Sequence, residues 1–194
     1  TRMNLVVSGS ITSLMLRIFQ HAKEPLFGRA DNIIKLSALD ITTLKEILHD
    51  HNPHFHNDDL LALYAITGGV PKYLELLCDS GKVTVDKMID FVAHDNSPFI
   101  DEGRNLLIEE FGRNYSTYFS ILSAISGGIN TQPRIEAALG DKSVGGQLKR
   151  LIEDYDIIAR VRPILAPEGT QTVRYEIKEH FTRFWFNYFD RPRL

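Results

Sequence analysis

Six side chains in the last third of the chain have the chemistry to contact phosphate groups. They are Gln147, Lys149, Arg150, Arg160, Arg162 and Arg174. Lysine and arginine neutralise phosphate charge, and a glutamine amide donates to phosphate oxygens. Acidic residues lie among them, at Glu153, Asp154 and Asp156, and strong duplex binders are usually more basic. The set therefore predicts either contact with double-stranded DNA or docking of a protein or of another part of the same chain.

A second group of residues with metal-binding chemistry lies near position 50. Histidines occupy positions 49, 51, 54 and 56, next to Asp50, and imidazole with carboxylate is a ligand set for zinc or nickel. The segment is expected to be a loop, and no second cluster exists in the sequence to complete a rigid site. We therefore interpret it as a polar connection and predict no metal site.

The six phosphate-binding candidates require a scaffold, and the sequence after Pro98 predicts one. Leu107, Phe111, Tyr115, Tyr118, Leu122 and Ile125 form one helical stripe that ends at Gly127-Gly128. Thr131 and Ser143 are expected to cap two further helices, and strands 157–162 and 173–177 surround a turn at 167–170. Three helices and a hairpin predict a winged helix-turn-helix, with the candidates on its third helix and its wing. A last helix, 180–189, carries an aromatic face that exceeds what a small winged helix can bury, which predicts a partner segment or a thick aromatic core.

The preceding residues predict two other pieces. Apolar runs at 5–10 and 33–36 are typical of strands buried in a parallel sheet, with a helix at 13–20 between them. Short helices follow from Asp40, an expected N-cap, to about residue 96. The predicted fold is mainly α with minor β: a truncated α/β remnant at 1–40, a helical lid bundle at 41–97 and a winged helix at 98–194.

Composition bounds the classes of protein that remain. The 194 residues are 43% hydrophobic, as expected of a folded chain, and the single cysteine, Cys78, excludes a disulfide framework. No run approaches the length of a membrane span, so we predict a cytoplasmic protein with no membrane partner. Residues 1–110 carry a net charge of −6 and residues 111–194 one of +3, which predicts separate partners for the two halves. Because the chain starts on Thr1 and enters a strand-like run almost at once, we expect a piece of a longer protein.

Four strings, in this order and at this spacing, resemble those of prokaryotic AAA+/STAND-like ATPases of the archaeal type. They are Leu-Val-Val-Ser-Gly-Ser at 5–10, Pro-Leu-Phe-Gly-Arg at 25–29, Ile-Thr-Gly-Gly-Val-Pro-Lys-Tyr at 66–73 and Gly-Gly-Gln-Leu-Lys-Arg-Leu-Ile-Glu-Asp-Tyr-Asp at 145–156, which continues into Arg-Val-Arg-Pro at 160–163. The resemblance covers nearly all of the chain. It implies the P-loop fold of the remnant, the lid, and a winged helix followed by a nuclease-like domain.

The resemblance also implies roles for individual residues. Ser8 or Ser10 would sense the γ-phosphate or its attacking water, and Arg29 would stabilise charge during phosphoryl transfer. Gly69 and Pro71 would lie against the adenine, because glycine permits close approach. If the resemblance is set aside, the same strings indicate ordinary structure: a turn after a strand, the end of one helix before the next, and a solvent-exposed arginine in a loop.

Two parts of an ATPase site are missing from the sequence. It contains no G-x-x-x-x-G-K-[ST] loop and no acidic strand end to hold magnesium. ATP and Mg²⁺ are therefore expected in the full-length parent, bound largely by a preceding P-loop segment, and neither should bind tightly to this chain alone.

Together these inferences predict the response half of an ATPase. The lid and winged helix would couple ATP binding and hydrolysis in the parent protein to engagement of DNA or of a protein. Two alternatives stay open: a stand-alone winged-helix regulator that binds DNA, and an adaptor that binds protein through the aromatic C-terminal helix.

Overall fold

The computed structural model describes residues 4–9, 12–162 and 173–190, and within them the chain is mainly helical with one two-stranded sheet. This confirms the predicted fold class of mainly α with minor β. The helices are α1 (Thr12–Gln20), α2 (Ile41–His51), α3 (Asn57–Thr67), α4 (Pro71–Asp79), α5 (Val85–Ala93), α6 (Phe99–Phe111), η1 (Gly112–Asn114), α7 (Tyr115–Ser126), α8 (Gln132–Ala138), α9 (Gly145–Glu153) and α10 (His180–Tyr188). The strands are β1 (Ile158–Val161) and β2 (Arg174–Ile177).

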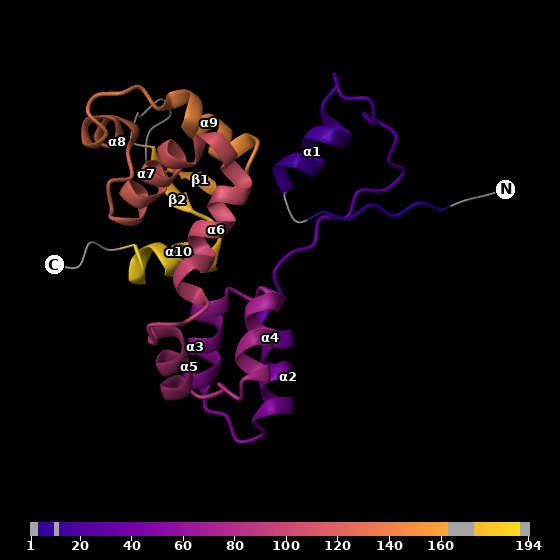
Figure 1. Cartoon of the computed structure of the whole chain (residues 1–194), viewed down its shortest axis with the longest axis vertical. Coiled ribbons are helices and arrows are strands. Elements are labelled where there is room, and N and C mark those ends of the chain that lie inside the picture. The colour runs from indigo at the N-terminus through magenta and orange to yellow at the C-terminus, as the bar shows by residue number, and fades with distance from the viewer. Residues whose placement is uncertain (1–3, 10–11, 163–172, 191–194) are drawn as a thin grey trace.

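Helices α2 to α5 form one bundle, which we call the lid bundle, at the lower end of the molecule in Figure 1. Asp40 caps α2 as predicted, since its Oδ1 accepts from the Thr43 amide at 2.8 Å. Apolar residues at helical spacing point inward, and Leu44, Leu63 and Met88 are fully buried. Short amphipathic helices of this kind are stabilised mainly by their shared core.

Helices α7, α8 and α9 with strands β1 and β2 form a second group, which we call the hairpin unit (Figure 1). The strands pair antiparallel, with Ile158 opposite Ile177 and Val161 opposite Arg174. The Tyr175 amide donates to the Asn130 carbonyl at 2.8 Å, so the segment between α7 and α8 lies along the free edge of β2. Three helices and a hairpin therefore occur in the predicted winged-helix order, while the predicted turn at 167–170 lies outside the described residues.

The single helix predicted from Leu107 to Ile125 is two helices. Gly112 has φ 52°, a conformation that favours glycine, and it ends α6 before α7 begins at Tyr115. The stripe still marks the core, because Leu107, Tyr118 and Ile125 are buried. The apolar spacing continues across the break because α6 and α7 both bury their apolar residues in the same core.

Helix α10 connects the hairpin unit to the lid bundle, since it contacts α3, α6, α7 and β2. Trp185 donates its Nε1 hydrogen to the Ile100 carbonyl of α6 at 2.9 Å, and the Phe181 ring stacks on Tyr73 of α4 with centroids 4.0 Å apart. Phe181, Trp185 and Phe186 are buried. Half of the six aromatic side chains of this helix are therefore core between the two groups of helices, and Phe184 and Phe189 pack partly buried against that core.

The two strands predicted near the N-terminus are not formed. Residues 4–9 and 32–40 carry no regular secondary structure, and Val6, Ile34 and Leu36 are 90%, 81% and 89% exposed. A strand needs neighbours for its backbone groups and for both apolar faces, and the described residues supply none to these runs. The sequence pattern therefore indicates a preference for strand structure that the described residues do not satisfy.

Candidate functional site

The turn between α3 and α4 is buried and held by backbone interactions. Thr67 donates its hydroxyl to the Leu63 carbonyl at 2.6 Å and accepts from the Gly69 amide at 3.2 Å. Gly68 and Gly69 have φ values of 59° and 79°, in the left-handed region that glycine adopts readily. The Leu39 amide donates to the Gly69 carbonyl at 2.8 Å. The segment before α2 is therefore fixed to the turn.

Helix α10 covers the other side of this turn. A Cβ on Gly68 would lie 2.8 Å from the Cβ of His180 and 3.2 Å from the Phe181 amide nitrogen. His180 Nε2 and the Tyr64 hydroxyl are 2.9 Å apart, which joins α10 to α3. The turn is thus a junction of three segments: the linker at residue 39, the lid bundle and α10.

A polar cluster lies beside the junction. Lys72 Nζ and the Tyr73 hydroxyl both donate to Glu102 Oε1 of α6, at 2.6 and 3.1 Å. Burial, followed by the negative charge of Glu102, raises the pKa of Tyr73 far above its ordinary value. Tyr73 is therefore a neutral hydrogen-bond donor at all physiological pH values.

The structure places the residues implied by the ATPase resemblance in different environments. Gly69 is buried, and the close approach that it permits is occupied by the Leu39 backbone, while Pro71 is exposed at the first position of α4. Ser8 and Arg29 are exposed, and Ser10 lies outside the described residues. Sequence reasoning assigned the glycines to contact with adenine, whereas the structure gives a packing reason for them within the chain.

The N-terminal segment reaches the other half of the chain instead of the turn. Among the described residues, two hydrogen bonds join residues 4–36 to the rest: the Ser13 amide to Glu110 Oε1 at 3.3 Å, and Lys35 Nζ to Asp156 Oδ2 at 2.7 Å. Neither involves Ser8 or Arg29. The described residues therefore do not bring the predicted phosphate-sensing residues together with the turn at 67–71.

The six candidate phosphate contacts occupy more than one face of the hairpin unit. Gln147, Lys149 and Arg150 lie on α9. Side chains of directly paired antiparallel residues share one face of a sheet, so Arg174 lies on the side of Val161, and Arg160 lies on the side of Tyr175. Lys149, Arg150, Arg160, Arg162 and Arg174 are all exposed, and Gln147 is half-buried. The hairpin unit thus presents cations from α9 and from both faces of the wing.

The acidic residues near this surface are partly neutralised within the chain. Glu153 pairs with Lys149 at 3.7 Å. Asp156 accepts from both Lys178 and Lys35. Partial burial acts to raise the pKa of Asp156, but the hydrogen bonds with these lysines outweigh it and hold the pKa below its usual value. Asp156 therefore opposes an approaching phosphate less than its formal charge suggests.

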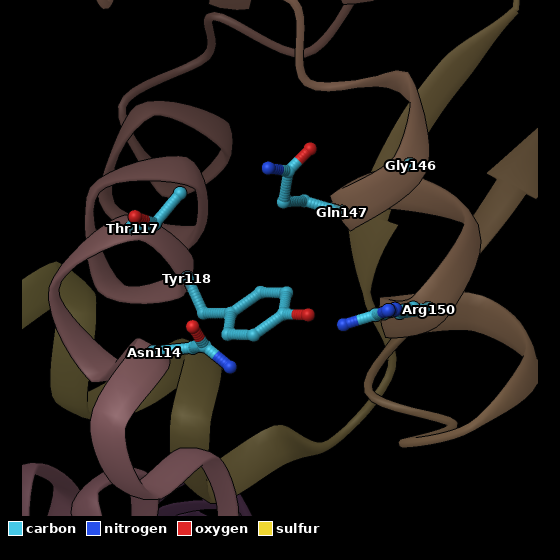
Figure 2. Close-up of a pocket in the computed structure, with 6 residues that line it drawn as sticks. All are labelled: Asn114, Thr117, Tyr118, Gly146, Gln147 and Arg150. Carbon is cyan, nitrogen blue, oxygen red and sulfur yellow. The ribbon is translucent and has the colours of Figure 1, made fainter.

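Arg150 faces α7, as Figure 2 shows, with its guanidinium directed toward the Tyr118 hydroxyl. The hydrogen bond with this hydroxyl raises the pKa of Arg150 above its ordinary value. Asn114, Thr117 and Tyr118 contribute the α7 side of the pocket between the two helices. Sequence reasoning missed these three residues, since Tyr118 belongs to the core stripe and nothing in the spacing shows that α9 packs opposite it.

Two classes of site are absent from the described part of the chain. No three histidine, cysteine, aspartate or glutamate side chains converge there as metal ligands would, and His51 Nδ1 lies 2.9 Å from the Ile47 carbonyl of its own helix. In the same residues, no helix combines the length and apolar character that crossing a bilayer requires.

The chain is similar to a protein of an archaeon. The uncharacterized protein MJECL04 of Methanocaldococcus jannaschii is 31% identical over 190 residues, which cover 97% of this chain and 41% of that protein. This chain therefore spans about two fifths of the length of the curated relative that it matches. No family model matches the chain, and no solved structure matches it.

Proposed function

We propose that this chain is the lid and winged-helix part of an AAA+/STAND-type ATPase, which couples the nucleotide state of the full-length protein to engagement of DNA. The observation that carries the proposal is the buried junction at 67–71. The turn expected to respond to nucleotide is fixed to the linker through Gly69 and to α10 through Gly68. Because α10 also packs on α7 and β2, a shift of the turn would be transmitted to the hairpin unit.

The exposed apolar runs near the N-terminus support the first part of this proposal. Val6, Ile34 and Leu36 have the character of strands buried on both faces, yet they are almost fully exposed. In the proposed parent protein, the sheet of a P-loop segment would pair with these runs and cover them. The relative from Methanocaldococcus jannaschii, more than twice as long as the matched region, is consistent with a longer parent.

In this proposal ATP and Mg²⁺ bind chiefly to that preceding segment. Arg29, exposed in the loop after α1, would supply a forked cation to phosphate oxygens, and Ser8 or Ser10 would sense the γ-phosphate. Pairing of the N-terminal runs with the sheet would bring these residues to the nucleotide. A cytoplasmic location and a downstream nuclease-like domain belong to the same proposal.

DNA is the partner that the surface of the chain supports best. Exposed cations come from α9 and from both faces of the wing, and Asp156 is compensated by two lysines. The aromatic helix is a weaker docking surface, because Phe181, Trp185 and Phe186 are buried, although Tyr188 is 72% exposed. An adaptor that binds through α10 is therefore less well supported than a hairpin unit that binds DNA.

The test compares the full-length protein with its Arg29→Ala variant. We expect the full-length protein to hydrolyse ATP, and the variant to lose on the order of 10³-fold in kcat if Arg29 acts as an arginine finger. Lys45→Ala, an exposed cation of α2, is the matched control and should leave kcat unchanged. We also expect a non-hydrolysable ATP analogue to change the affinity of the full-length protein for a DNA duplex.

Three results would contradict parts of the proposal. A full-length protein without ATP binding or hydrolysis would refute the ATPase assignment, and duplex binding by that protein would favour a stand-alone regulator. Duplex affinity that is the same with and without the analogue would refute the coupling. Equal kcat for the Arg29→Ala and Lys45→Ala variants would remove Arg29 from the site.

A further inference from the structure

A pocket of about 240 Å³ lies between the start of α7 and the start of α9. It is lined by Asn114, Thr117, Tyr118, Gly146, Gln147 and Arg150. Figure 2 shows the side chains of both helices around the same space, with the Tyr118 hydroxyl and the Arg150 guanidinium directed toward each other. The volume exceeds that of a single water, so the pocket can admit a small polar group.

The lining has the charge and the donors that an oxyanion requires. None of the six residues is acidic, and Arg150 brings a permanent positive charge. The side-chain amides of Asn114 and Gln147 add neutral donors. Tyr118 is 1% exposed, and Figure 2 shows its hydroxyl directed toward the guanidinium. The site therefore combines one cation with neighbouring hydrogen-bond donors.

The backbone of α9 adds to this arrangement. The first amides of a helix have no partner within it, and Val144 at the N-cap supplies no side-chain acceptor. Gly146 lies in this first turn, and a Cβ built on it meets nothing within 4 Å, so the backbone there is open to a ligand. Helix amides and an arginine at one site favour a tetrahedral oxyanion over a neutral ligand.

Three carboxylates lie around the pocket without belonging to its lining. Glu136 accepts from the Val144 amide and from Gln132, both at 3.0 Å. Glu153 pairs with Lys149. Asp154 lies one turn beyond Arg150, and its charge contributes to the raised pKa of that residue. Asp154 is thus a carboxylate that competes with a bound anion for Arg150.

We propose that the pocket between α7 and α9 is a phosphate site that binds one phosphodiester group of a DNA backbone. The assignment of the phosphate group to DNA rests on the proposed function, whereas the preference for an oxyanion rests on the pocket alone. The site would fix the position of α9 on the duplex and carry no sequence information. The same chemistry would accept a free phosphate ion, so the experiment separates the two sources.

Gly146 allows a charge to be placed in the pocket without steric conflict. Gly146→Asp should abolish phosphate binding by repulsion, while Gly146→Ala, of similar shape and without charge, should keep it. An acidic residue in the first turn of a helix stabilises that helix, so lost binding in the Asp variant would not reflect unfolding. Equal thermal stability of the two variants checks this point.

Two further variants change the charge balance in opposite directions. Arg150→Gln should weaken duplex binding about tenfold and lower the slope of log K against log salt by about one. Asp154→Asn should strengthen binding, since it removes the competing charge next to Arg150. Lys45→Gln, on the distant α2, is the control for an equal loss of charge.

The assay uses the complete chain with a labelled DNA duplex of mixed sequence, and separately with inorganic phosphate followed by amide NMR shifts of residues 145–150. The proposal expects binding of the duplex that Gly146→Asp and Arg150→Gln weaken and Gly146→Ala retains. If phosphate shifts these amide signals but the duplex does not bind, the pocket is an oxyanion site. That result would refute DNA as the origin of the phosphate group and also the proposed engagement of DNA. Duplex binding insensitive to all pocket variants would overturn the pocket proposal and leave DNA engagement intact, and binding of neither probe would overturn both.

Discussion

The contact between α6 and α10 can be tested by adding one methyl group. Gly103 lies inside α6, and a Cβ built on it would be 2.7 Å from Cδ1 of Trp185 and closer still to Cγ and Cδ2 of the ring. Trp185 is 2% exposed, and its Nε1 is bound to the Ile100 carbonyl at 2.9 Å, so the ring has little freedom to withdraw. We therefore expect Gly103→Ala to separate the two helices.

Two opposing effects set the size of the change. Alanine favours a helix interior over glycine by about 1 kcal/mol. Overpacking a close-packed core costs about 1–3 kcal/mol, and the short approach to Trp185 places this case at the upper end. The expected net loss in the free energy of unfolding is about 1–2 kcal/mol, which for a chain of 194 residues lowers Tm by about 2–8 °C.

Trp185 is the single tryptophan of the chain, so its fluorescence reports on this contact directly. Urea unfolding of Gly103→Ala, followed by fluorescence and by circular dichroism, should show the lower stability and an emission shifted to longer wavelength. The double variant Gly103→Ala/Trp185→Leu should recover part of the loss, which a double-mutant cycle measures. If Gly103→Ala is as stable as the wild type with unchanged emission, the described packing of α10 on α6 is wrong.

Three further perturbations test other parts of the structure. Gly69→Ala should cost about 1–3 kcal/mol more than Gly81→Ala in urea unfolding, because both glycines have positive φ but the Leu39 backbone occupies the space beside Gly69 alone; equal losses would contradict the junction. Asp59→Ala should lose about 2–4 kcal/mol, since the buried carboxylate accepts from two backbone amides at 2.8 Å, and unchanged stability would exclude that role. The hydrogen bond from the Val144 amide lowers the pKa of Glu136, so the stability difference between wild type and Glu136→Gln should be full above about pH 4.5 and disappear as the pH falls through the lowered pKa; a difference independent of pH would refute this.

Helix positions in this chain follow from local chemistry that is visible in the sequence. Asp40 caps α2, Pro71 opens α4 and Gly68 closes α3, each for a reason that acts within one turn of backbone. Thr131 occupies the N-cap of α8, but α9 begins one residue later than expected, with Val144 at its N-cap in place of Ser143. Helix boundaries are less certain than helix existence because neighbouring residues compete for the cap.

The N-terminal runs show where sequence patterns fail. Residues 5–10 and 33–36 have strand composition, but a strand forms only when other strands satisfy its backbone, and that condition is not local. The candidate sites depend on long-range packing in the same way. The approach of His180 to Gly68 joins residues more than one hundred positions apart, and the pocket lined by Tyr118 and Arg150 depends on α7 and α9 lying together.

The contact between Lys35 and Asp156 has a consequence for measurements of nucleic-acid binding. The side chains are 59% and 37% exposed, so dissolved ions screen their attraction strongly. Rising ionic strength would weaken this contact and leave Asp156 with Lys178 as its partner, while the hydrogen bond from the Ser13 amide to Glu110 still joins the N-terminal segment to α6. A salt titration of duplex affinity would then record two processes, the loss of phosphate contacts and the loss of the Lys35–Asp156 ion pair. A Lys35→Gln protein lacks this ion pair at every salt concentration. The slope of its duplex affinity against salt would therefore report the phosphate contacts alone.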